Sequence, residues 1–202
     1  MNTIYTIGYT AFNKDEFIKT LKRFNISCLI DVRSIPIASE YYSEYSKQPL
    51  EKLLNLNGII YRNYATEFGA RQLNKSYYAT DGYLNFNLFA KSPVFLSGVE
   101  KLNKGINRGY VFVLMCAEKD PLNCHRSIMI GRELLKIGFN VQNILSNGNL
   151  QSQKEIENRL IDLYFKERNQ ISIFSNEESE QELIEKAYTL RNKEIGFVLE
   201  AI

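Results

Sequence analysis

YVFVLMC, the run from Tyr110 to Cys116, is the most hydrophobic strand candidate in the chain. A continuously apolar strand is typical of a parallel sheet that is covered on both faces. The polar loop AEKDPLN (residues 117–123) follows it, and Cys124-His125-Arg126 then begins a predicted helix that Gly138 closes. This stretch therefore predicts a strand, a loop and a helix of an α/β fold.

Strands and helices alternate along the rest of the chain. Runs rich in β-branched and aromatic residues predict strands at 3–7, 28–33, 59–64 and 139–145. Helical spacing and capping residues predict helices at 14–24, 49–58, 83–90, 93–106, 151–167 and 175–193. We expect an α/β fold with a mainly parallel sheet and helices on both faces, in a Rossmann-like three-layer arrangement. Residues 1–146 are expected to form this core domain. Residues 147–202 are expected to form a C-terminal helical extension that packs on the core without adding charged side chains to its site.

Composition limits the possible partners and compartment. The 202 residues carry 25 basic and 23 acidic side chains, a net charge of +2, which leaves no electrostatic footprint for nucleic acid. Three cysteines do not make a disulfide framework, so reduced thiols and a cytoplasmic location are the simpler interpretation. No secretory signal or apolar run of membrane-spanning length is visible, and we expect no membrane partner. The oligomeric state is left open.

The predicted topology brings several polar segments to one place. In open α/β sheets, ligands bind outside the carboxyl ends of the strands. Gly8 and Tyr9, the segment Asp31–Ser34 and the segment Cys116–Ser127 all follow predicted strand ends. We therefore expect them to line one concavity at the carboxyl edge of the sheet.

The residue types at this edge suggest an anionic ligand and an enzyme. A helix that begins near Cys124 would direct free N–H groups and its positive dipole end at the ligand, and the same field would lower the pKa of the thiol. Arg33 and Arg126 offer planar forks for phosphate or carboxylate. The candidate catalytic residues are Cys124 as nucleophile and His125, Asp31 and Glu118 as proton-transfer groups. The candidate ligand-binding residues are Gly8, Tyr9, Arg33, Ser34, Cys116, Arg126 and Ser127. The expected ligand is a phosphate-bearing, nucleotide-like small molecule; no cofactor is assigned.

Structural roles compete with each of these assignments. Arg33 could simply pair with Asp31 or Glu118, and His125 could bond a neighbouring carbonyl group. Cys116 could be a small core residue. Cys28 begins its strand about 16 Å from the carboxyl edge and should be core. The tyrosines of residues 41–45 could form a lid or pack in the core.

Zinc is a weaker interpretation of the two cysteines and the histidine. A catalytic zinc needs only three protein ligands, and Cys116, Cys124 and His125 are of the right types. Adjacent residues of a helix diverge by about 100°, however, and the chain has no CxxC or HxxxH spacing. We therefore assign no metal ligand. A Cys/Cys/His metal or redox site stays open as an alternative, as does a non-catalytic module that binds nucleic acid or a partner protein.

Four motifs in order resemble a known family. They are Thr6-Ile7-Gly8-Tyr9, the DVRSIP segment from Asp31 to Pro36, the EFGAR segment from Glu67 to Arg71, and Cys116-Ala117-Glu118 followed by Cys124-His125-Arg126-Ser127. Over roughly residues 3–146 the chain resembles the domain of unknown function 488 (DUF488) family. Two positions depart from the family pattern: Ala70 replaces a second glycine, and Tyr9 stands where histidine is more frequent. The resemblance implies an α/β cytoplasmic protein without an established activity, and it names no substrate.

Overall fold

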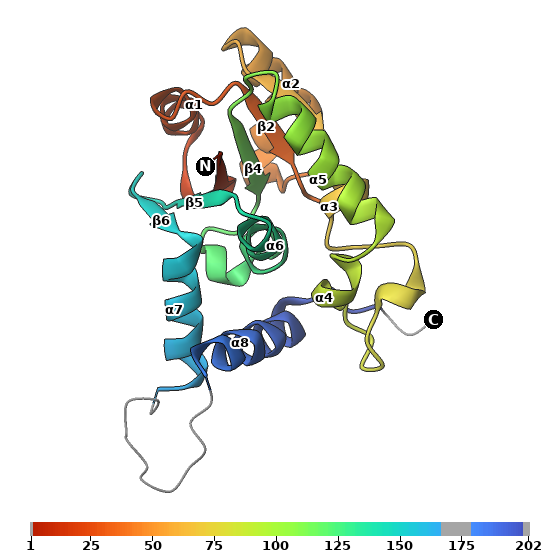
Figure 1. The fold of residues 1–202 in the computed structure, drawn as a ribbon. Helices are drawn as coiled ribbons and strands as arrows, with labels where there is room; N and C mark the ends of the chain where they lie inside the picture. Colours follow the sequence, from red (N-terminus) through yellow and green to blue (C-terminus); the bar gives the residue numbers. More distant parts are fainter. Residues whose placement is uncertain (1, 167–178, 200–202) are drawn as a thin grey trace, which may run out of the picture.

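The computed structural model describes residues 2–166 and 179–199. This part of the chain contains a six-stranded sheet in the order β3-β2-β4-β1-β5-β6 (Figure 1). The strands are β1 (Thr3–Gly8), β2 (Cys28–Asp31), β3 (Ile60–Asn63), β4 (Phe112–Cys116), β5 (Asn140–Ile144) and β6 (Leu150–Ser152). Strands β1 to β5 are all parallel to one another, and β6 pairs antiparallel with β5 at the edge of the sheet. The predicted α/β fold with a mainly parallel sheet is confirmed.

The helices begin where capping residues place them. Asn13 caps the first helix with a reciprocal bond to Glu16, and Ser92 caps the longest helix of the core just before Pro93. The helices are α1 (Lys14–Arg23), α2 (Lys47–Leu56), α3 (Ala65–Phe68), α4 (Phe86–Phe89), α5 (Pro93–Ile106), α6 (Arg132–Lys136), α7 (Gln153–Tyr164) and α8 (Glu180–Ile195). No helix in the described ranges is long and apolar enough to cross a membrane.

Two apolar clusters cover the two faces of the sheet. Alternate residues of each strand point to opposite faces. In β4, Leu114 and Cys116 join the cluster that contains side chains of α3, α5, α6, α7 and α8, whereas Val113 and Met115 join the cluster of α1 and α2. The predicted three-layer arrangement is therefore confirmed, and the cluster against α5 is the larger one.

The connections that follow β1 and β4 run toward opposite edges of the sheet, to β2 and to β5. Strands β1 and β4 are neighbours, with Gly8 opposite Cys116 at their carboxyl ends. After β1 the chain passes to α1 on one face, and after β4 it passes to α6 on the other face (Figure 1). Such a switch point leaves a place for ligands at the carboxyl ends of the two strands.

Several predicted boundaries need correction. The helix after β4 begins at Arg126, not Cys124, and its first part, Arg126–Gly131, is a π-helix that continues into α6. The tyrosine-rich segment Glu40–Tyr45 forms a short 3₁₀ helix. Strand β6 was not predicted, and α7 begins after it. The start of the last predicted helix, residues 175–178, lies outside the described residues.

Candidate functional site

The loop after β4 packs directly over the end of β1. Thr10 donates hydrogen bonds from its backbone N–H and its hydroxyl group to the carbonyl oxygen of Ala117, at 3.2 and 2.7 Å. A Cβ atom added to Gly8 would lie 1.9 Å from the carbonyl oxygen of Glu118. Gly8 thus allows close contact between two backbone segments, and its role in ligand binding stays a prediction.

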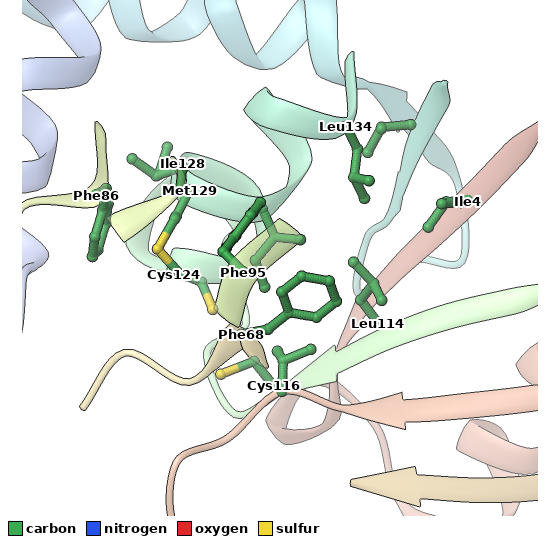
Figure 2. Packing of buried hydrophobic residues seen from close by; sticks show 14 of the residues in the cluster. Ile4, Phe68, Phe86, Phe95, Leu114, Cys116, Cys124, Ile128, Met129 and Leu134 are labelled. Atoms are coloured by element: carbon green, nitrogen blue, oxygen red, sulfur yellow. The ribbon is translucent and has the colours of Figure 1, made fainter. Parts of the chain in front are cut away.

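Two cysteines and the histidine meet at the carboxyl end of β4. Sγ of Cys116 lies 3.8 Å from Nδ1 of His125, and Sγ of Cys124 lies 3.9 Å from the same nitrogen. Both cysteines belong to the apolar cluster that contains Phe68 and Leu114 (Figure 2). Cys124 is only 1% exposed. The thiol of Cys124 is therefore part of the core.

A carboxylate links this buried group to the surface. Glu118 is an exposed residue, yet its Oε2 atom lies 2.9 Å from Sγ of Cys124, so that one proton joins the two atoms. We call Cys116, Glu118, Cys124 and His125 the thiol–imidazole cluster. The cluster lies on the α5 face of the sheet, because Cys116 is on that face of β4.

The imidazole ring of His125 is held by the backbone. Its Nε2 atom lies 3.0 Å from the carbonyl oxygen of Val32, which can only accept a hydrogen bond. Nε2 therefore carries a proton, and Nδ1 is the nitrogen that faces the two sulfur atoms. The expectation that His125 could bond a carbonyl group is correct, and this bond orients the ring toward the cysteines.

The backbone of Cys124 explains how adjacent side chains can converge. Cys124 is extended, with φ −137° and ψ 135°, whereas His125 is helical. The prediction that the two side chains diverge as neighbours in a helix is therefore wrong. The N–H group of Cys124 is bonded to the carbonyl group of Pro121, so it is not a free donor at a helix N-terminus. The carbonyl group of Cys124 accepts hydrogen bonds from the N–H groups of Ser127 and Ile128, so Cys124 directly precedes the helical backbone, and the predicted effect of the helix dipole on its thiol stays a prediction.

Negative charge in the cluster concentrates on Cys124. Burial raises the pKa of Cys124, but a hydrogen bond from Cys116 and the charge of Arg126 outweigh it and bring the pKa well below the usual value. The hydrogen bond to Cys124, together with burial, raises the pKa of Cys116 well above that value. Burial and the charge of Cys124 also raise the pKa of Glu118. Burial lowers the pKa of His125, but the hydrogen bond and charge of Cys124 raise it overall.

Arg126 lies beneath the loop after β4. Its side chain is fully buried, and its Nη1 atom donates to the carbonyl oxygen of Glu118 at 2.7 Å. Its Nε–H group is buried and has no hydrogen-bond partner among residues 2–166 and 179–199. No carboxylate among the described residues forms an ion pair with it. Arg126 therefore brings a positive charge next to Cys124 without an ion pair to a carboxylate of the described residues.

Asp31 and Arg33 form a separate group on the opposite face. Nε and Nη2 of Arg33 donate to the two oxygens of Asp31 at 2.9 and 2.6 Å, and Nη2 also donates to the carbonyl oxygen of Tyr45. Tyr61 donates its hydroxyl proton to Asp31 at 2.8 Å. The guanidinium group lies over the ring of Tyr9, with 5.1 Å to its centroid. The structural alternative for Arg33, pairing with Asp31, is the one observed, and both oxygens of the predicted proton-transfer residue Asp31 are occupied.

Tyr9 is next to both groups. Burial raises its pKa, and among the smaller influences the charge of Arg33 lowers the pKa whereas the charges of Cys116 and Glu118 raise it. The Asp31–Arg33 group and the thiol–imidazole cluster therefore lie at one edge of the sheet. They lie on opposite faces of it, because successive side chains of a strand point to opposite faces.

Other predicted residues serve the surrounding structure. The Ser34 hydroxyl oxygen accepts a hydrogen bond from the N–H group of Arg71, and Ser127 is buried and donates to Gln153 of α7. Neither hydroxyl group reaches the thiol–imidazole cluster. Cys28 is 4% exposed and core, as predicted. In the tyrosine segment, Tyr45 is buried and stacks on Tyr9.

A hollow of about 780 Å³ opens at the same edge. It is lined by Glu118–Pro121, Asn123, Leu145–Asn147, Gln151 and Arg159. Nη2 of Arg159, in α7, pairs with Asp120 at 2.8 Å. The expectation that residues beyond 146 bring no charged side chain to this edge is therefore wrong. Glu118 is the residue that lies both in the hollow and in the thiol–imidazole cluster.

One known family matches the stretch of chain that contains most of these residues. The model of the domain of unknown function DUF488 matches residues 13–132, more than half of the chain. The chain belongs to the DUF488 family. The match includes the whole thiol–imidazole cluster and both arginines of the edge, whereas Gly8 and Tyr9 precede it. No curated protein and no solved structure matches the chain.

The DUF488 motifs identify side chains but miss the groups that hold them. The carbonyl group of Val32 orients His125, and Tyr61 binds Asp31 from the next strand. A backbone acceptor has no sequence signal. One signal was available for the shape of the loop: Asp120-Pro121 has the form of a helix cap, and Asp120 does cap the short helix Pro121–Asn123 that precedes Cys124.

Proposed function

We propose that this DUF488 protein is an enzyme that binds a small anionic molecule, of the phosphate-bearing or nucleotide-like class, at the carboxyl edge of the sheet. Arg33 and Arg126 bind the anion. Cys124 is the reactive group, and His125 and Glu118 exchange protons with it. Asp31 acts as a positioning residue for Arg33, because both of its oxygens already accept hydrogen bonds.

One observation carries this proposal. Nη1 of Arg33 and Nε of Arg126 are buried N–H donors that have no hydrogen-bond partner in the described part of the chain, and both lie at the same edge of the sheet. Most buried polar groups in folded proteins are hydrogen-bonded, so an unpartnered guanidinium donor calls for an acceptor from elsewhere. A phosphate or carboxylate group supplies acceptor oxygens with the geometry that guanidinium groups bind best. The turn at Glu118 and Lys119 lies over Arg126, so the ligand reaches that donor by displacing the turn.

Calorimetric titration of the whole chain with inorganic phosphate and with a nucleoside monophosphate tests the proposal. We expect saturable binding, weakened at least tenfold in Arg33→Lys and in Arg126→Lys, because loss of one charge-assisted hydrogen bond costs about 1.5–3 kcal/mol. Arg132→Lys is the matched control. Arg132 is also buried, and its Nε–H group has no partner among the residues that the structure describes, but its other nitrogens bond to Asn87 and Glu185 away from this edge.

Folding of each variant is checked by circular dichroism before titration. The proposal is supported if the anion affinity of Arg132→Lys stays within twofold of the wild type and the two edge variants lose binding. No saturable binding of either anion, or an equal loss in all three variants, contradicts it.

A further inference from the structure

The thiol–imidazole cluster has the composition of a metal site. Ligand atoms of Cys116, Cys124 and His125 all lie within 4.8 Å of one another, and all three residues are buried. The carboxylate of Glu118 extends from the surface to Sγ of Cys124, 2.9 Å away. Thiolate, imidazole and carboxylate groups are the ligands that Zn²⁺ takes in proteins.

The distances suit a tetrahedral ion. Zinc bonds of about 2.3 Å to sulfur and about 2.0 Å to nitrogen place a sulfur and a nitrogen ligand about 3.6 Å apart at tetrahedral angles. The two observed distances from sulfur to Nδ1 of His125 are 3.8 and 3.9 Å. An ion between these atoms therefore requires only small movements of the side chains.

The histidine is already held as a metal ligand is held. Metal-binding histidines usually donate their second ring N–H to a carbonyl or carboxylate group, which orients the ring. His125 donates Nε2–H to Val32, and Nδ1 points to the sulfur atoms. A histidine that served only to bond Val32 would not need two buried cysteines on its other side.

The charges also balance. Two thiolates and one carboxylate bring three negative charges to a buried position, which is costly without compensation. A divalent ion supplies two positive charges, and the buried guanidinium group of Arg126 supplies the third. Arg126 thus has a partner in the metal-bound cluster that no carboxylate of the described residues provides.

We propose that Cys116, Cys124 and His125 bind Zn²⁺, with Glu118 as the fourth ligand on the side of the hollow. When the ion binds, the proton between Cys124 and Glu118 and the thiol proton of Cys116 both leave to solvent, so that two thiolates and one carboxylate hold the ion. This site gives Cys124 the role of a metal ligand and places a Lewis acid at the carboxyl edge. With the ion bound, Cys124, His125 and Glu118 act as its ligands in place of the reactive and proton-transfer roles proposed above, whereas anion binding by Arg33 and Arg126 does not depend on the ion.

Titration of the metal-free full-length protein with Co²⁺ tests the site by absorption spectroscopy. We expect one Co²⁺ per chain, with intense d–d bands of a tetrahedral ion and a thiolate-to-cobalt charge-transfer band, all displaced by Zn²⁺. Cys116→Ser and Cys124→Ser should each lose half or more of the charge-transfer intensity. Cys28→Ser is the matched control: Cys28 is equally buried, but it lies at the opposite end of its strand and should leave the spectrum unchanged.

A second measurement needs no variant and covers the case in which a serine variant fails to fold. The chain has one histidine, so its imidazole signals in NMR spectra are unambiguous. Stoichiometric Zn²⁺ should shift these signals and abolish their response to pH. The proposal is overturned if Co²⁺ gives no charge-transfer band, if Cys28→Ser loses as much intensity as Cys124→Ser, or if Zn²⁺ leaves the His125 signals unchanged. Anion binding without metal binding would overturn this site alone and leave the proposed function in place.

Discussion

Nε2 of His125 lies 3.0 Å from the carbonyl oxygen of Val32, which follows β2, the strand beside β4. This bond joins the segment after β4 to the end of the neighbouring strand. It also determines which ring nitrogen meets the cysteines. The chemistry of the edge therefore depends on the register of two strands as much as on the Cys-His-Arg triplet.

In the metal-free protein, we expect His125 to titrate above the usual histidine pKa. Burial lowers its pKa, but the hydrogen bond to Cys124 and the negative charges of Cys124 and Glu118 raise it overall. The imidazolium form should thus persist to higher pH than in a free histidine, as followed by NMR. Cys124→Ser should lower the midpoint, whereas Cys28→Ser should not. A midpoint at or below that of free histidine would contradict the geometry.

The three thiols should titrate at different pH values in the metal-free protein. Ultraviolet absorbance of the thiolate should show one step well below the usual cysteine pKa, because the hydrogen bond from Cys116 and the charge of Arg126 overcome the effect of burial on Cys124. Burial raises the pKa of Cys28 to about 11, so its thiolate forms only in strongly alkaline solution. Cys124→Ser should remove the early step. An early step that survives in this variant would assign the thiolate to another cysteine.

Arg126→Met should lower the free energy of unfolding by about 1–3 kcal/mol, since it leaves the carbonyl group of Glu118 without its donor in a covered position. Urea unfolding measures the change. Arg62→Met is the control: Arg62 is exposed and donates to the carbonyl group of Tyr61 at the surface. That variant should stay within about 0.5 kcal/mol of the wild type. Equal losses of unfolding free energy in the two variants would show that the buried position of Arg126 does not contribute to stability.

Gly8→Ala should displace the loop after β4 and weaken the thiol–imidazole cluster. The new Cβ atom meets the Glu118 carbonyl oxygen, a backbone atom that cannot move alone, and overpacking of this kind costs about 1–3 kcal/mol. Gly58→Ala is the control, because it adds a Cβ atom in open space where the strain comes only from φ +73°. Both variants should unfold more easily, but only Gly8→Ala should weaken Co²⁺ binding. If folded Gly8→Ala binds Co²⁺ as tightly as the wild type, the position of the loop after β4 does not determine the metal site, which contradicts this prediction.

Much of the fold follows from patterns that are local in the sequence. The apolar run that ends at Cys116, the capping box at Asn13 and the Ser92-Pro93 start of α5 each specify an element without reference to the rest of the chain. The edge strand β6 is different. It is three residues long, and its pairing with β5 depends on a partner rather than on its own composition.

The sequence predicts where in the fold the site lies, but it does not predict how the side chains of the site are arranged. Strand ends placed Asp31, Cys116 and His125 at one edge. Asp31 and Cys116 lie on opposite faces because of the exact register of each strand. A shift of one residue in that register moves a side chain to the other face. The convergence of Cys124 and His125 depends on the short helix at Pro121–Asn123, which delays the next helix and leaves Cys124 extended. The bond from His125 to Val32 is a contact between distant segments, and only the folded chain shows it.

X-ray absorption at the zinc edge of the zinc-loaded wild-type protein tests the metal-bound cluster most directly, because it counts the ligands of the ion without any substitution. We predict two sulfur neighbours at about 2.3 Å and two nitrogen or oxygen neighbours at about 2.0–2.1 Å. Two sulfur ligands would identify Cys116 and Cys124 as the donors if Cys28→Ser gives the same spectrum. A shell of nitrogen and oxygen alone, or a protein that retains no zinc after dialysis, would contradict the site.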